Sequence, residues 1–387
     1  GGGLAWAALE AYAQRQAKIV NDPQLLREAR FLVARHYPTS GLGNMFQSLV
    51  SEFLVAFLTD RVFVTDAFLV SQFLDFPTME GTNYSAVYET FGGAHVAYNA
   101  QYFLYTGVQS WLLCEDLEDV MQAQFAFIES DMYFAGLLIN NDVYAMQLAP
   151  LFGDRLFQTV SDFLFRPRGS IAAETMAFHQ ENLADRRTVG MHVRTHTLGH
   201  PGYVEPYAMN DARGHFLNSY WKCAHLASGG ALGGGQEGQE DPPLIYLAVD
   251  NGAVRHEAER VFGGQLVVRE APITRWNVEG QRAALIDILL LSFCDDIITT
   301  QMSTFSYVAH ALSSTVPYVV TMQGTCVRDV SSQPCLHAWR HIVLASDCFL
   351  GELPFLSSPE TRNCGYYTQQ SLDAPKNCEW LNAIPKE

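Results

Sequence analysis

The chain has 387 residues, of which 48% are hydrophobic, so it is long enough for two domains with sizeable cores. Its 24 Lys and Arg residues are outnumbered by 41 Asp and Glu residues, and the formal net charge is −17. This charge argues against a nucleic-acid-binding protein, because phosphate backbones require clusters of Lys and Arg, but it leaves room for a single phosphorylated ligand in a local cationic pocket.

The first part of the chain predicts one strand–helix–strand turn of an α/β fold. FLVAR (31–35) is typical of a short apolar strand, and a Pro- and Gly-rich turn follows it. Apolar residues then recur at helical spacing from Asn44 to Thr59, and RVFVTD (61–66) indicates a second buried strand. The Phe- and Tyr-rich stretch from about 70 to 165 predicts helices and loops, with EDLED (115–119) on a solvated face.

A new α/β pattern begins near residue 187. We predict strands at 188–195, 243–250, 264–270, 295–300 and 317–322, and helices at 256–263, 281–294 and 303–312, the last with Ser303 as its N-cap candidate. This alternation predicts a parallel sheet with helices on both faces. The Gly-rich segment 228–241 is predicted as a surface insertion, because it lacks the Lys-Ser/Thr and the preceding strand of a phosphate loop.

We therefore expect an α/β protein with two Rossmann-like domains that face a central cleft. The predicted domains are 1–187 and 188–350, and a Cys-rich tail over 351–387 packs back on them. Ligands of open α/β sheets bind beyond the carboxyl ends of the strands. The segments 40–44, 192–196 and 301–305 should therefore line the cleft.

The eight cysteines contain no CxxC pair, so neither a zinc ribbon nor a redox motif is indicated. Five of them follow residue 325 in a segment rich in Pro, Ser and Asn, which predicts disulfides and a secretory compartment. Cys114 and Cys294 fit buried thiols, because their surroundings are apolar. The sequon Asn83-Tyr84-Ser85 permits the same compartment.

No apolar run is long enough for a membrane span, since charged residues interrupt the longest candidate, Phe53 to Leu74. The chain does not begin with Met, and no signal peptide is visible in Gly1 to Trp6. We expect a processed or truncated chain whose membrane leader is missing.

Three segments supply groups suited to a nucleotide diphosphate. Gly41 and Gly43 let the backbone approach a ligand, and Asn44 opens a helix whose N-terminus attracts anions. Arg194, at a strand end, carries a forked cation suited to phosphate oxygens. Ser303-Thr304-Phe305 opens another helix, and no DxD-type acidic motif stands in the predicted cleft, so we expect binding without a metal.

Simpler interpretations of these residues stay open. His192, His196 and His200 recur every four residues, a spacing that would suit zinc on one helix face, although VGMHVR is typical of a strand. Asp287 could be a helix-surface carboxylate, and Asn44, Ser303 and Thr304 could be plain helix caps. Cys335-Leu336-His337 fits half of a disulfide beside a packed His better than a metal pair.

Several ordered motifs resemble the plant xyloglucan fucosyltransferase family (glycosyltransferase family 37) over about residues 31 to 350. The motifs are FLVAR…SGLGNMFQSLVSEFLVAFLTDRVFVTD, SDMYFAGLLI, LFRP, VGMHVR, ALIDILLLSFCDDIITTQMSTFSYVAHAL, and PCLHAW with a downstream SDC. Ordered motifs over such a length are more specific than any one of them alone.

The resemblance implies a GT-B fold, with 1–187 as the acceptor-side domain and 188–350 as the GDP-sugar-binding domain. It implies inverting transfer of L-fucose from GDP-β-L-fucose, without a metal or another cofactor, to O2 of a β-galactoside in a glycan. An arabinoside acceptor, protein O-fucosylation and a catalytically silent sugar-binding protein are the alternatives. It also implies a type II membrane protein of the Golgi lumen, and the sequence leaves a homodimer open.

The resemblance also implies roles for individual residues. In the wider fucosyltransferase group, the Arg of a His-x-Arg element binds the donor diphosphate and the His lies by the guanine nucleotide, and these match Arg194 and His192. Asp287 matches an acidic residue that binds guanine, whose N1–H and N2–H₂ donors suit a carboxylate. The phosphate-contacting segment and the loop that closes on the donor are matched by Ser303, Thr304, Phe305, Gly43 and Asn44.

Negative charge builds on the departing GDP during such a transfer, and we expect Arg194 and two helix N-termini to stabilise it. The acceptor hydroxyl must also lose a proton, and His196 and Asp66 are the candidates for this base. Where the plant enzymes usually have Arg, Gln, Trp and Gly, this chain has Met45, His192, Met302 and Ser306. The chain is therefore expected to be a divergent member.

Overall fold

A computed structural model gives the structure of the chain and describes residues 2–36, 40–66, 72–104, 112, 115–139, 141, 143–195, 215–230, 242–271, 277–301, 303–321, 324–329 and 331–334. The described residues divide into two compact α/β units, 2–168 and 169–334. The division lies earlier than the predicted boundary between residues 187 and 188. Helix α12 (Gly169–Asn182) belongs to the second unit, where its Glu174 forms an ion pair of 2.6 Å with Arg282.

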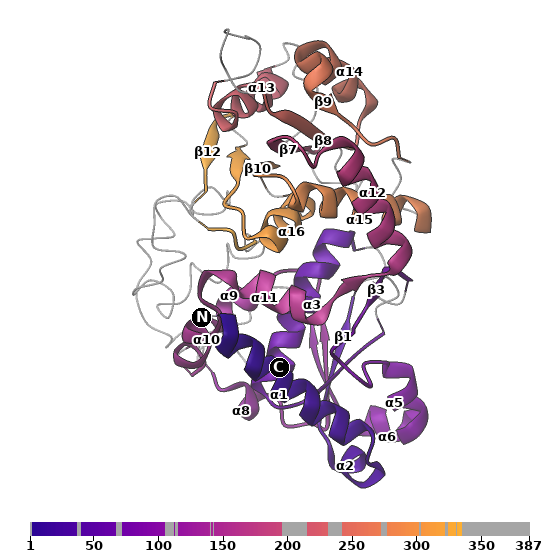
Figure 1. Cartoon of the computed structure of the whole chain (residues 1–387). Helices are drawn as coiled ribbons and strands as arrows, with labels where there is room; N and C mark the ends of the chain where they lie inside the picture. The colour runs from indigo at the N-terminus through magenta and orange to yellow at the C-terminus, as the bar shows by residue number, and fades with distance from the viewer. Residues whose placement is uncertain are drawn as a thin grey trace, which may run out of the picture. The chain divides into compact units, whose positions relative to one another are not determined.

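The first unit contains a parallel four-stranded sheet in the order β2-β1-β5-β4 (Figure 1). Its strands are β1 (Phe31–Arg35), β2 (Val62–Thr65), β4 (Ala100–Leu104) and β5 (Phe125–Glu129), and a separate antiparallel pair joins β3 (Leu74–Asp75) and β6 (Arg166–Pro167). The helical elements are α1 (Gly2–Val20), α2 (Pro23–Glu28), α3 (Leu42–Leu58), α5 (Tyr84–Phe91), α6 (Gly93–Tyr98), α8 (Leu117–Val120), α9 (Ala135–Leu138), α10 (Ala145–Phe152), η1 (Gly153–Arg155) and α11 (Leu156–Leu164).

The strand–helix–strand turn predicted from residue 31 onward is confirmed as β1, α3 and β2. Apolar residues on one face of the sheet, such as Phe31, Val33 and Val64, form a fully buried cluster. The start of the helix differs from the prediction, because Gly41 occupies the N-cap position and α3 begins at Leu42. Asn44 is therefore the third residue of the helix, and its interpretation as the residue that opens or caps the helix is wrong.

The prediction of only helices and loops between about 70 and 165 is wrong for the short strand β3 and for two longer segments. AQYFL and FAFIE form β4 and β5, which pair in parallel along their whole length. Both segments are short and rich in aromatic residues, so their apolar pattern does not separate a strand from a helix. Pairing with β1 decides the matter, because it places β5 inside the sheet with Phe125 and Phe127 buried.

The second unit contains a six-stranded sheet in the order β12-β11-β10-β7-β8-β9, parallel except for the β11–β12 pair. Its strands are β7 (Thr188–Val193), β8 (Leu244–Val249), β9 (Leu266–Val267), β10 (Asp296–Thr300), β11 (Tyr318–Val320) and β12 (Cys326–Arg328). The further helical elements are α13 (His215–Ala227), α14 (Gly252–Phe262), η2 (Gly263–Gln265), α15 (Val278–Ser292) and α16 (Thr304–Ser313). The strands and helices predicted after residue 187 are confirmed, with differences of a few residues at their ends.

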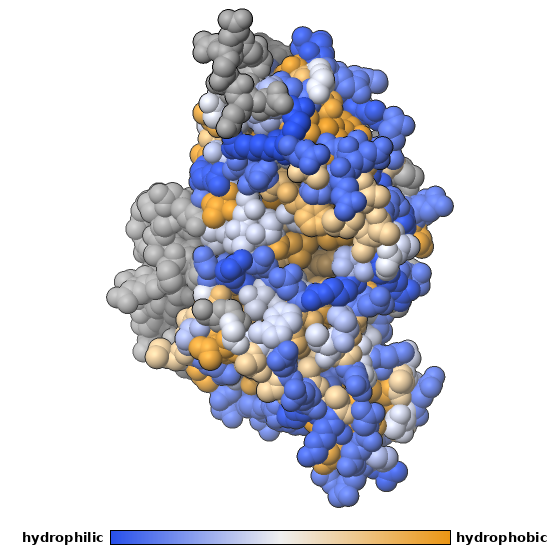
Figure 2. Space-filling model, viewed as in Figure 1, coloured by the Kyte–Doolittle hydropathy of each residue, from blue (hydrophilic) through white to orange (hydrophobic). Residues whose placement is uncertain are grey.

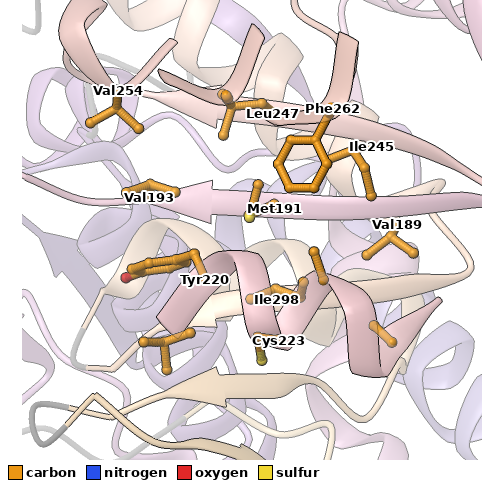
Figure 3. Close-up of a cluster of buried hydrophobic side chains, with 14 residues drawn as sticks. Val189, Met191, Val193, Tyr220, Cys223, Ile245, Leu247, Val254, Phe262 and Ile298 are labelled. Atoms are coloured by element: carbon orange, nitrogen blue, oxygen red, sulfur yellow. The ribbon is translucent and has the colours of Figure 1, made fainter. Parts of the chain in front are cut away.

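Helices cover both faces of this second sheet, as predicted. Val189, Met191 and Val193 of β7 point into a buried cluster with side chains of β8, α13 and α14 (Figure 3). The intervening Gly190 faces the end of α15, and an added Cβ would lie 3.0 Å from the Leu291 side chain of that helix and 2.9 Å from the Sγ atom of Cys294, which follows it. Successive side chains of a strand point to opposite faces, so His192 lies on the same face as Gly190.

A disulfide joins Cys223 of α13 to Cys326 of β12, whose Cα atoms are 5.4 Å apart. Cys294 is a free buried thiol, as predicted. Cys114 and the four cysteines beyond residue 334 lie outside the described residues, and so does the predicted tail over 351–387.

Helix α1 packs on the first unit through a stripe of buried side chains at helical spacing, which includes Ala5, Leu9 and Tyr12. Figure 2 shows hydrophilic residues over α2 and the adjoining end of α1, at the lower end of that view. Within the described part of the chain, no helix combines the length and the apolar character that a membrane crossing requires.

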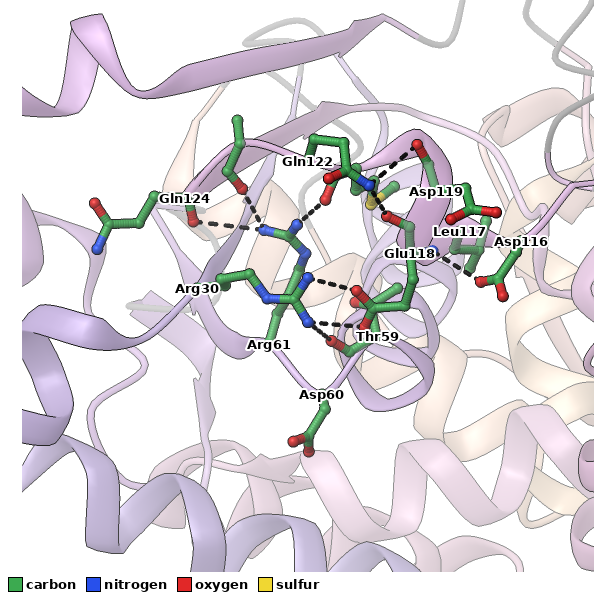
Figure 4. Close-up of polar contacts among 12 residues, drawn as sticks. Arg30, Thr59, Asp60, Arg61, Asp116, Leu117, Glu118, Asp119, Gln122 and Gln124 are labelled. Atoms are coloured by element: carbon green, nitrogen blue, oxygen red, sulfur yellow. Dashed lines mark hydrogen bonds and ion pairs between the residues drawn. The ribbon is translucent and has the colours of Figure 1, made fainter.

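Arg61 is a fully buried guanidinium at the start of β2. Its Nη1 atom donates to the carbonyl oxygens of Ala123 at 2.9 Å and Phe31 at 3.3 Å, and its Nη2 atom donates to that of Met121 (Figure 4). Arg30 forms an ion pair nearby with Glu118, a residue of the EDLED segment. Burial lowers the pKa of Arg61 to about 10, which still leaves it charged at neutral pH.

We predict that Arg61→Lys destabilises the protein by about 2–4 kcal/mol, because one ammonium group cannot reach all the carbonyl oxygens that the planar guanidinium of Arg61 binds. Thermal or urea unfolding would measure the loss. Arg27→Lys, on the exposed surface of α2, is the matched control and should leave the stability unchanged. Equal stability of the two variants would contradict this role of Arg61.

Candidate functional site

The carboxyl end of β7 brings His192 against the start of α16. The imidazole ring stacks on the ring of Phe305, with centroids 4.6 Å apart and planes inclined by 20°. His192 is 4% exposed, and its Nδ1 atom has no hydrogen-bond partner among the described residues. Burial lowers the pKa of His192 to about 3; the charge of Asp250 opposes this shift, and that of Arg194 adds to it. His192 is therefore neutral at physiological pH.

Arg194 follows β7 and keeps part of its side chain in solvent, with 27% of its surface exposed. Its Nε atom lies 3.5 Å from the Oδ2 atom of Asp250, which follows the neighbouring strand β8. The other oxygen of Asp250 accepts hydrogen bonds from the amide and the hydroxyl of Thr195, at 2.9 and 2.8 Å. Asp250 thus holds the segment after β7 and orients the guanidinium of Arg194.

Asp250 was not among the predicted site residues. The sequence does place it at the end of a predicted strand, but only the pairing of β7 with β8 brings it beside Arg194. In that register Val193 lies opposite Val249, so the next residues of both strands meet at the same edge.

The hydroxyl of Thr300, at the end of β10, joins three elements. It donates to the carbonyl oxygen of His192 at 3.0 Å and accepts from the amide of Arg194 at 3.0 Å. Its proton is used in the first bond, so the Tyr220 hydroxyl of α13 must donate to it, at 2.6 Å. Thr300 and Tyr220 are fully buried, and together they fix the turn that carries Arg194.

Ser303 occupies the N-cap position of α16, as predicted, although no hydrogen bond of its side chain caps the helix. Thr304 and Phe305 begin the helix, and the backbone N–H groups of a first helical turn have no partner within the helix and carry a partial positive charge. The stack of His192 on Phe305 places this helix start beside the end of β7. Four of the predicted residues therefore lie together at this helix start, whose partial positive charge attracts anions. They are His192, Ser303, Thr304 and Phe305.

Asp287 lies in the middle of α15 and is held in an ion pair. Its Oδ1 atom accepts from Arg269 Nε at 2.8 Å and from the Tyr246 hydroxyl at 2.9 Å. Burial raises the pKa of Asp287, and Arg269 opposes the rise. Bidentate pairing with guanine would need both carboxylate oxygens, and Oδ1 already accepts two hydrogen bonds, so this role stays a prediction.

The predicted residues of the first unit also lie at the carboxyl edge of its sheet. Gly41 and Gly43 are at the start of α3, and the side chain of Asn44 forms a hydrogen bond with Asp131, which follows β5. Asp66 follows β2, and its Oδ2 atom lies 3.4 Å from Arg35 Nε. Burial raises the pKa of Asp66, and the charge of Arg35 opposes the rise.

Two further groups at this edge were not predicted. His36 follows β1, and its Nδ1 atom is 2.9 Å from the Ser48 hydroxyl of α3 and 3.3 Å from the carbonyl oxygen of Ser130. Burial lowers the pKa of His36 to about 4, so it is neutral. Glu52 of α3 is fully buried, and neither of its carboxyl oxygens has a hydrogen-bond partner within the described ranges. The sequence shows that Glu52 lies inside an apolar helical pattern. It does not show that the carboxyl group lacks a hydrogen-bond partner within the described ranges.

His196 and His200 lie outside the described residues, so the structure tests neither the predicted base nor the zinc alternative. In the segments that the structure does describe, no group of three or more His, Cys, Asp or Glu side chains is arranged to hold a metal ion. A cavity of about 480 Å³ lies at the amino ends of β7 and β10, lined by residues such as His179, Arg186 and Asp295, and contains none of the predicted residues.

The fold and the strand-end site define a GT-B-type α/β protein with Rossmann-like units, and the predicted fold class is confirmed by comparison with solved structures. The structure of an Arabidopsis thaliana FUT1 mutant in complex with GDP is similar to this chain with a TM-score of 0.67 and 18% sequence identity. The similarity covers 86% of this chain and 84% of that one.

Residues 261–345 match the family model described as Xyloglucan fucosyltransferase. Two Arabidopsis thaliana relatives are Probable fucosyltransferase 4, 22% identical over 76% of this chain, and Fucosyltransferase 3, 25% identical over 77% of it. The matches cover 64% of each of these relatives, so this chain spans less than two thirds of their length. The predicted resemblance is confirmed: the chain is similar to plant fucosyltransferases, and the identities of 22% and 25% fit the expected divergence.

We predict that Thr300→Val destabilises the second unit by about 1–3 kcal/mol, because the Tyr220 hydroxyl and the Arg194 amide lose a buried acceptor. Hydrogen exchange of the Arg194 amide should become faster. Thr300→Ser keeps the acceptor and should retain slow exchange. Thr299→Val, which removes a single hydroxyl bond to the Tyr318 carbonyl oxygen, is the matched control on the same strand. Unchanged exchange in Thr300→Val would show that the hydroxyl does not hold this turn.

Glu52 predicts a pH dependence of stability. Burial raises the pKa of Glu52 well above its ordinary value, and the charge of Asp66 adds to the rise. At a pH above the pKa of Glu52 in the unfolded state, the unfolded protein therefore binds fewer protons than the folded protein. As the pH rises from there, the free energy of unfolding falls by about 1.4 kcal/mol per pH unit until the pKa of Glu52 in the folded state is reached.

Glu52→Gln removes this proton uptake, so the stability of the variant relative to the wild type should rise from pH 5 to pH 8. Urea unfolding at several pH values would measure the difference. Glu89→Gln, at an exposed position of α5, should show a constant difference. A constant difference for Glu52→Gln as well would mean that Glu52 does not carry its proton into the folded state.

Proposed function

We propose that this protein is a fucosyltransferase that moves L-fucose from GDP-β-L-fucose to a sugar hydroxyl with inversion and without a metal. The proposed acceptor position is O2 of a β-galactoside in a glycan or cell-wall polysaccharide. The relatives named above support fucosyl transfer, and one further Arabidopsis thaliana relative, 23% identical, is named Galactoside 2-alpha-L-fucosyltransferase.

One arrangement carries the proposal: Arg194, the His192–Phe305 stack and the first turn of α16 meet at the carboxyl end of β7. Among the described residues, the Nη atoms of Arg194 make no hydrogen bond, and Asp250 holds the guanidinium through Nε. A guanidinium held at Nε can still present its Nη edge to phosphate oxygens. The backbone N–H groups of α16 would bind the same diphosphate.

These groups suit the chemistry of a departing nucleoside diphosphate. Negative charge grows on the GDP phosphate as the bond to fucose breaks, and donors fixed before the reaction stabilise that charge without reorganisation. The bonds of Arg194 and Thr195 to Asp250 and Thr300 support this preorganisation. The buried, neutral imidazole of His192 supports the partly exposed ring of Phe305, which would offer a flat face to the nucleotide.

Inversion requires that the acceptor hydroxyl lose its proton as it attacks the anomeric carbon. Asp66 is one proposed base, because a raised pKa brings a carboxylate closer to the value suited to proton transfer at neutral pH. His196 is the other proposed base. The Cys223–Cys326 disulfide supports an oxidising compartment, which we propose to be the Golgi lumen, with the protein anchored as a type II membrane protein.

We predict that the wild-type protein transfers fucose from GDP-fucose to galactose-terminated xyloglucan oligosaccharides without added metal, and that NMR of the product shows an α1,2 linkage. Arg194→Ala should lower the transfer rate by about 100-fold or more, because one fixed donor to the developing charge is lost. It should also reduce the rise in melting temperature that GDP produces, while the melting temperature without GDP stays the same.

Arg255→Ala is the matched control, since Arg255 forms ion pairs of 3.0 Å with Glu259 and Glu270 on the same unit but outside the site. Near-normal transfer by Arg194→Ala would refute the assignment. If GDP stabilises the wild-type protein but no fucose is transferred to the oligosaccharide, arabinosides and folded protein modules are the next acceptors to assay. Failure with all of them would favour the catalytically silent sugar-binding protein.

A further inference from the structure

A disulfide ties helix α13 to the edge strand β12 of the second sheet. Cys223 of α13 is fully buried, whereas Cys326 of β12 is partly exposed. Strand β12 is three residues long and lies at the end of the sheet, next to β11. The disulfide therefore fixes a helix to a short strand and so to one end of the sheet.

The strand pairing places this disulfide in the same row of the sheet as Thr300. Cys326 lies opposite Val320 of β11, and Val320 lies opposite Thr300 of β10. Residues paired across neighbouring strands point to the same face, so Cys326 and Thr300 both face α13. Two strand spacings separate them, which is about 10 Å.

Helix α13 meets this row with a single face. Tyr220 and Cys223 are three positions apart, and both belong to the buried cluster between α13 and the sheet (Figure 3). Ala224 and Ala227 are also buried on this face. Because alanines bury little apolar surface, they hold the helix less firmly than larger side chains would. A covalent bond one helical turn from Tyr220 restrains the same face directly.

Hydrogen bonds connect this face of α13 to Arg194. The Tyr220 hydroxyl donates to Oγ1 of Thr300 at 2.6 Å, and the same oxygen accepts from the amide of Arg194 at 3.0 Å. A shift of α13 away from the sheet by about 1 Å would take the two hydroxyl oxygens out of hydrogen-bonding distance. The turn that carries Arg194 therefore depends on where α13 lies.

We propose that the Cys223–Cys326 disulfide is a positioning element of the anion site. It holds Tyr220 on Thr300, and Thr300 holds the turn of Arg194, so the protein without this disulfide binds a nucleoside diphosphate more weakly. The inference rests on the proposed function, in which Arg194 binds the diphosphate of the donor. The physical reason is preorganisation, because a group that is already fixed loses less conformational freedom when its ligand binds.

The test measures the Kd of GDP by isothermal titration, with neither sugar donor nor acceptor present. The double variant Cys223→Ala/Cys326→Ala should bind GDP about three- to tenfold more weakly, the range that loss of one neutral hydrogen bond produces. Tyr220→Phe keeps the disulfide and the aromatic ring, and it should weaken binding by a similar factor. Hydrogen exchange of the Arg194 amide should become faster in both proteins, by a larger factor than exchange in the interior of α14.

A double-mutant cycle separates positioning from a general loss of stability. If the disulfide acts through Tyr220, adding Tyr220→Phe to the double cysteine variant should weaken GDP binding no further. Ile245→Ala is the matched control, because Ile245 is fully buried in the same cluster but lies near the start of β8. It should lower the melting temperature and leave the Kd of GDP within about twofold of the wild type.

If the cysteine variant does not fold, dithiothreitol replaces the substitutions. The dithiol reduces the disulfide to two thiols and is itself oxidised to a cyclic disulfide, while mass spectrometry follows the Cys223–Cys326 bond. The loss of GDP affinity should coincide with the loss of this bond.

Wild-type affinity for GDP in a folded protein without the disulfide would overturn the proposal, and so would additive effects in the cycle. GDP binding that depends on the disulfide, in a protein that transfers no fucose, would support the positioning role and refute the proposed transfer. If the wild-type protein does not bind GDP, the proposed function fails. In that case exchange of the Arg194 amide decides the positioning role, which unchanged exchange in the cysteine variant would refute.

Discussion

The alternation of side chains along β7 is the constraint on which the site of the second unit depends. Val189, Met191 and Val193 must enter the apolar cluster beneath α13 and α14, so the residues between them face α15 and α16. His192 has no other face available, and it meets Phe305 at the start of α16. Burial of three apolar side chains, each worth about 1.5–3 kcal/mol, thus fixes where a neutral imidazole lies. A shift of one residue in register would exchange the two faces.

The first unit shows the opposite balance, because several polar side chains of α3 are buried at a cost in stability. Gln47 and Glu52 are fully buried, and no side-chain nitrogen or oxygen of either forms a hydrogen bond within the described ranges. An apolar side chain at these positions would remove the cost of desolvation. Such costs are typical of sites kept for binding or chemistry, and α3 is the helix that begins at the carboxyl edge beside Asn44 and Asp131. The polar residues of α3 therefore belong with the strand ends as part of one candidate site.

Much of the fold could be predicted from the sequence, because β7, β8, α15 and α16 have periodic apolar patterns and clear ends. The strands β4 and β5 could not, since five-residue segments made mostly of aromatic and aliphatic residues fit a helix or a strand until a partner is known. The site follows the same division. Arg194 and Ser303 were recognisable from local sequence, whereas Asp250 and Tyr220 act through the pairing of distant elements. The ion pair of Asp287 with Arg269 likewise joins two separate segments, so local sequence patterns could not predict it.

The charges around Arg194 are compatible with the proposed anion site in a protein with a net charge of −17. Asp250 neutralises Arg194 when no anion is present, and the ion pair is weak enough to rearrange, because both side chains are more than one-fifth exposed. A protonated His192 would add a second positive charge beside Arg194, but burial keeps the pKa of His192 at about 3. Titration of His192 therefore contributes nothing between pH 5 and pH 8. Any change in anion affinity over that range must therefore come from the phosphate itself or from other groups.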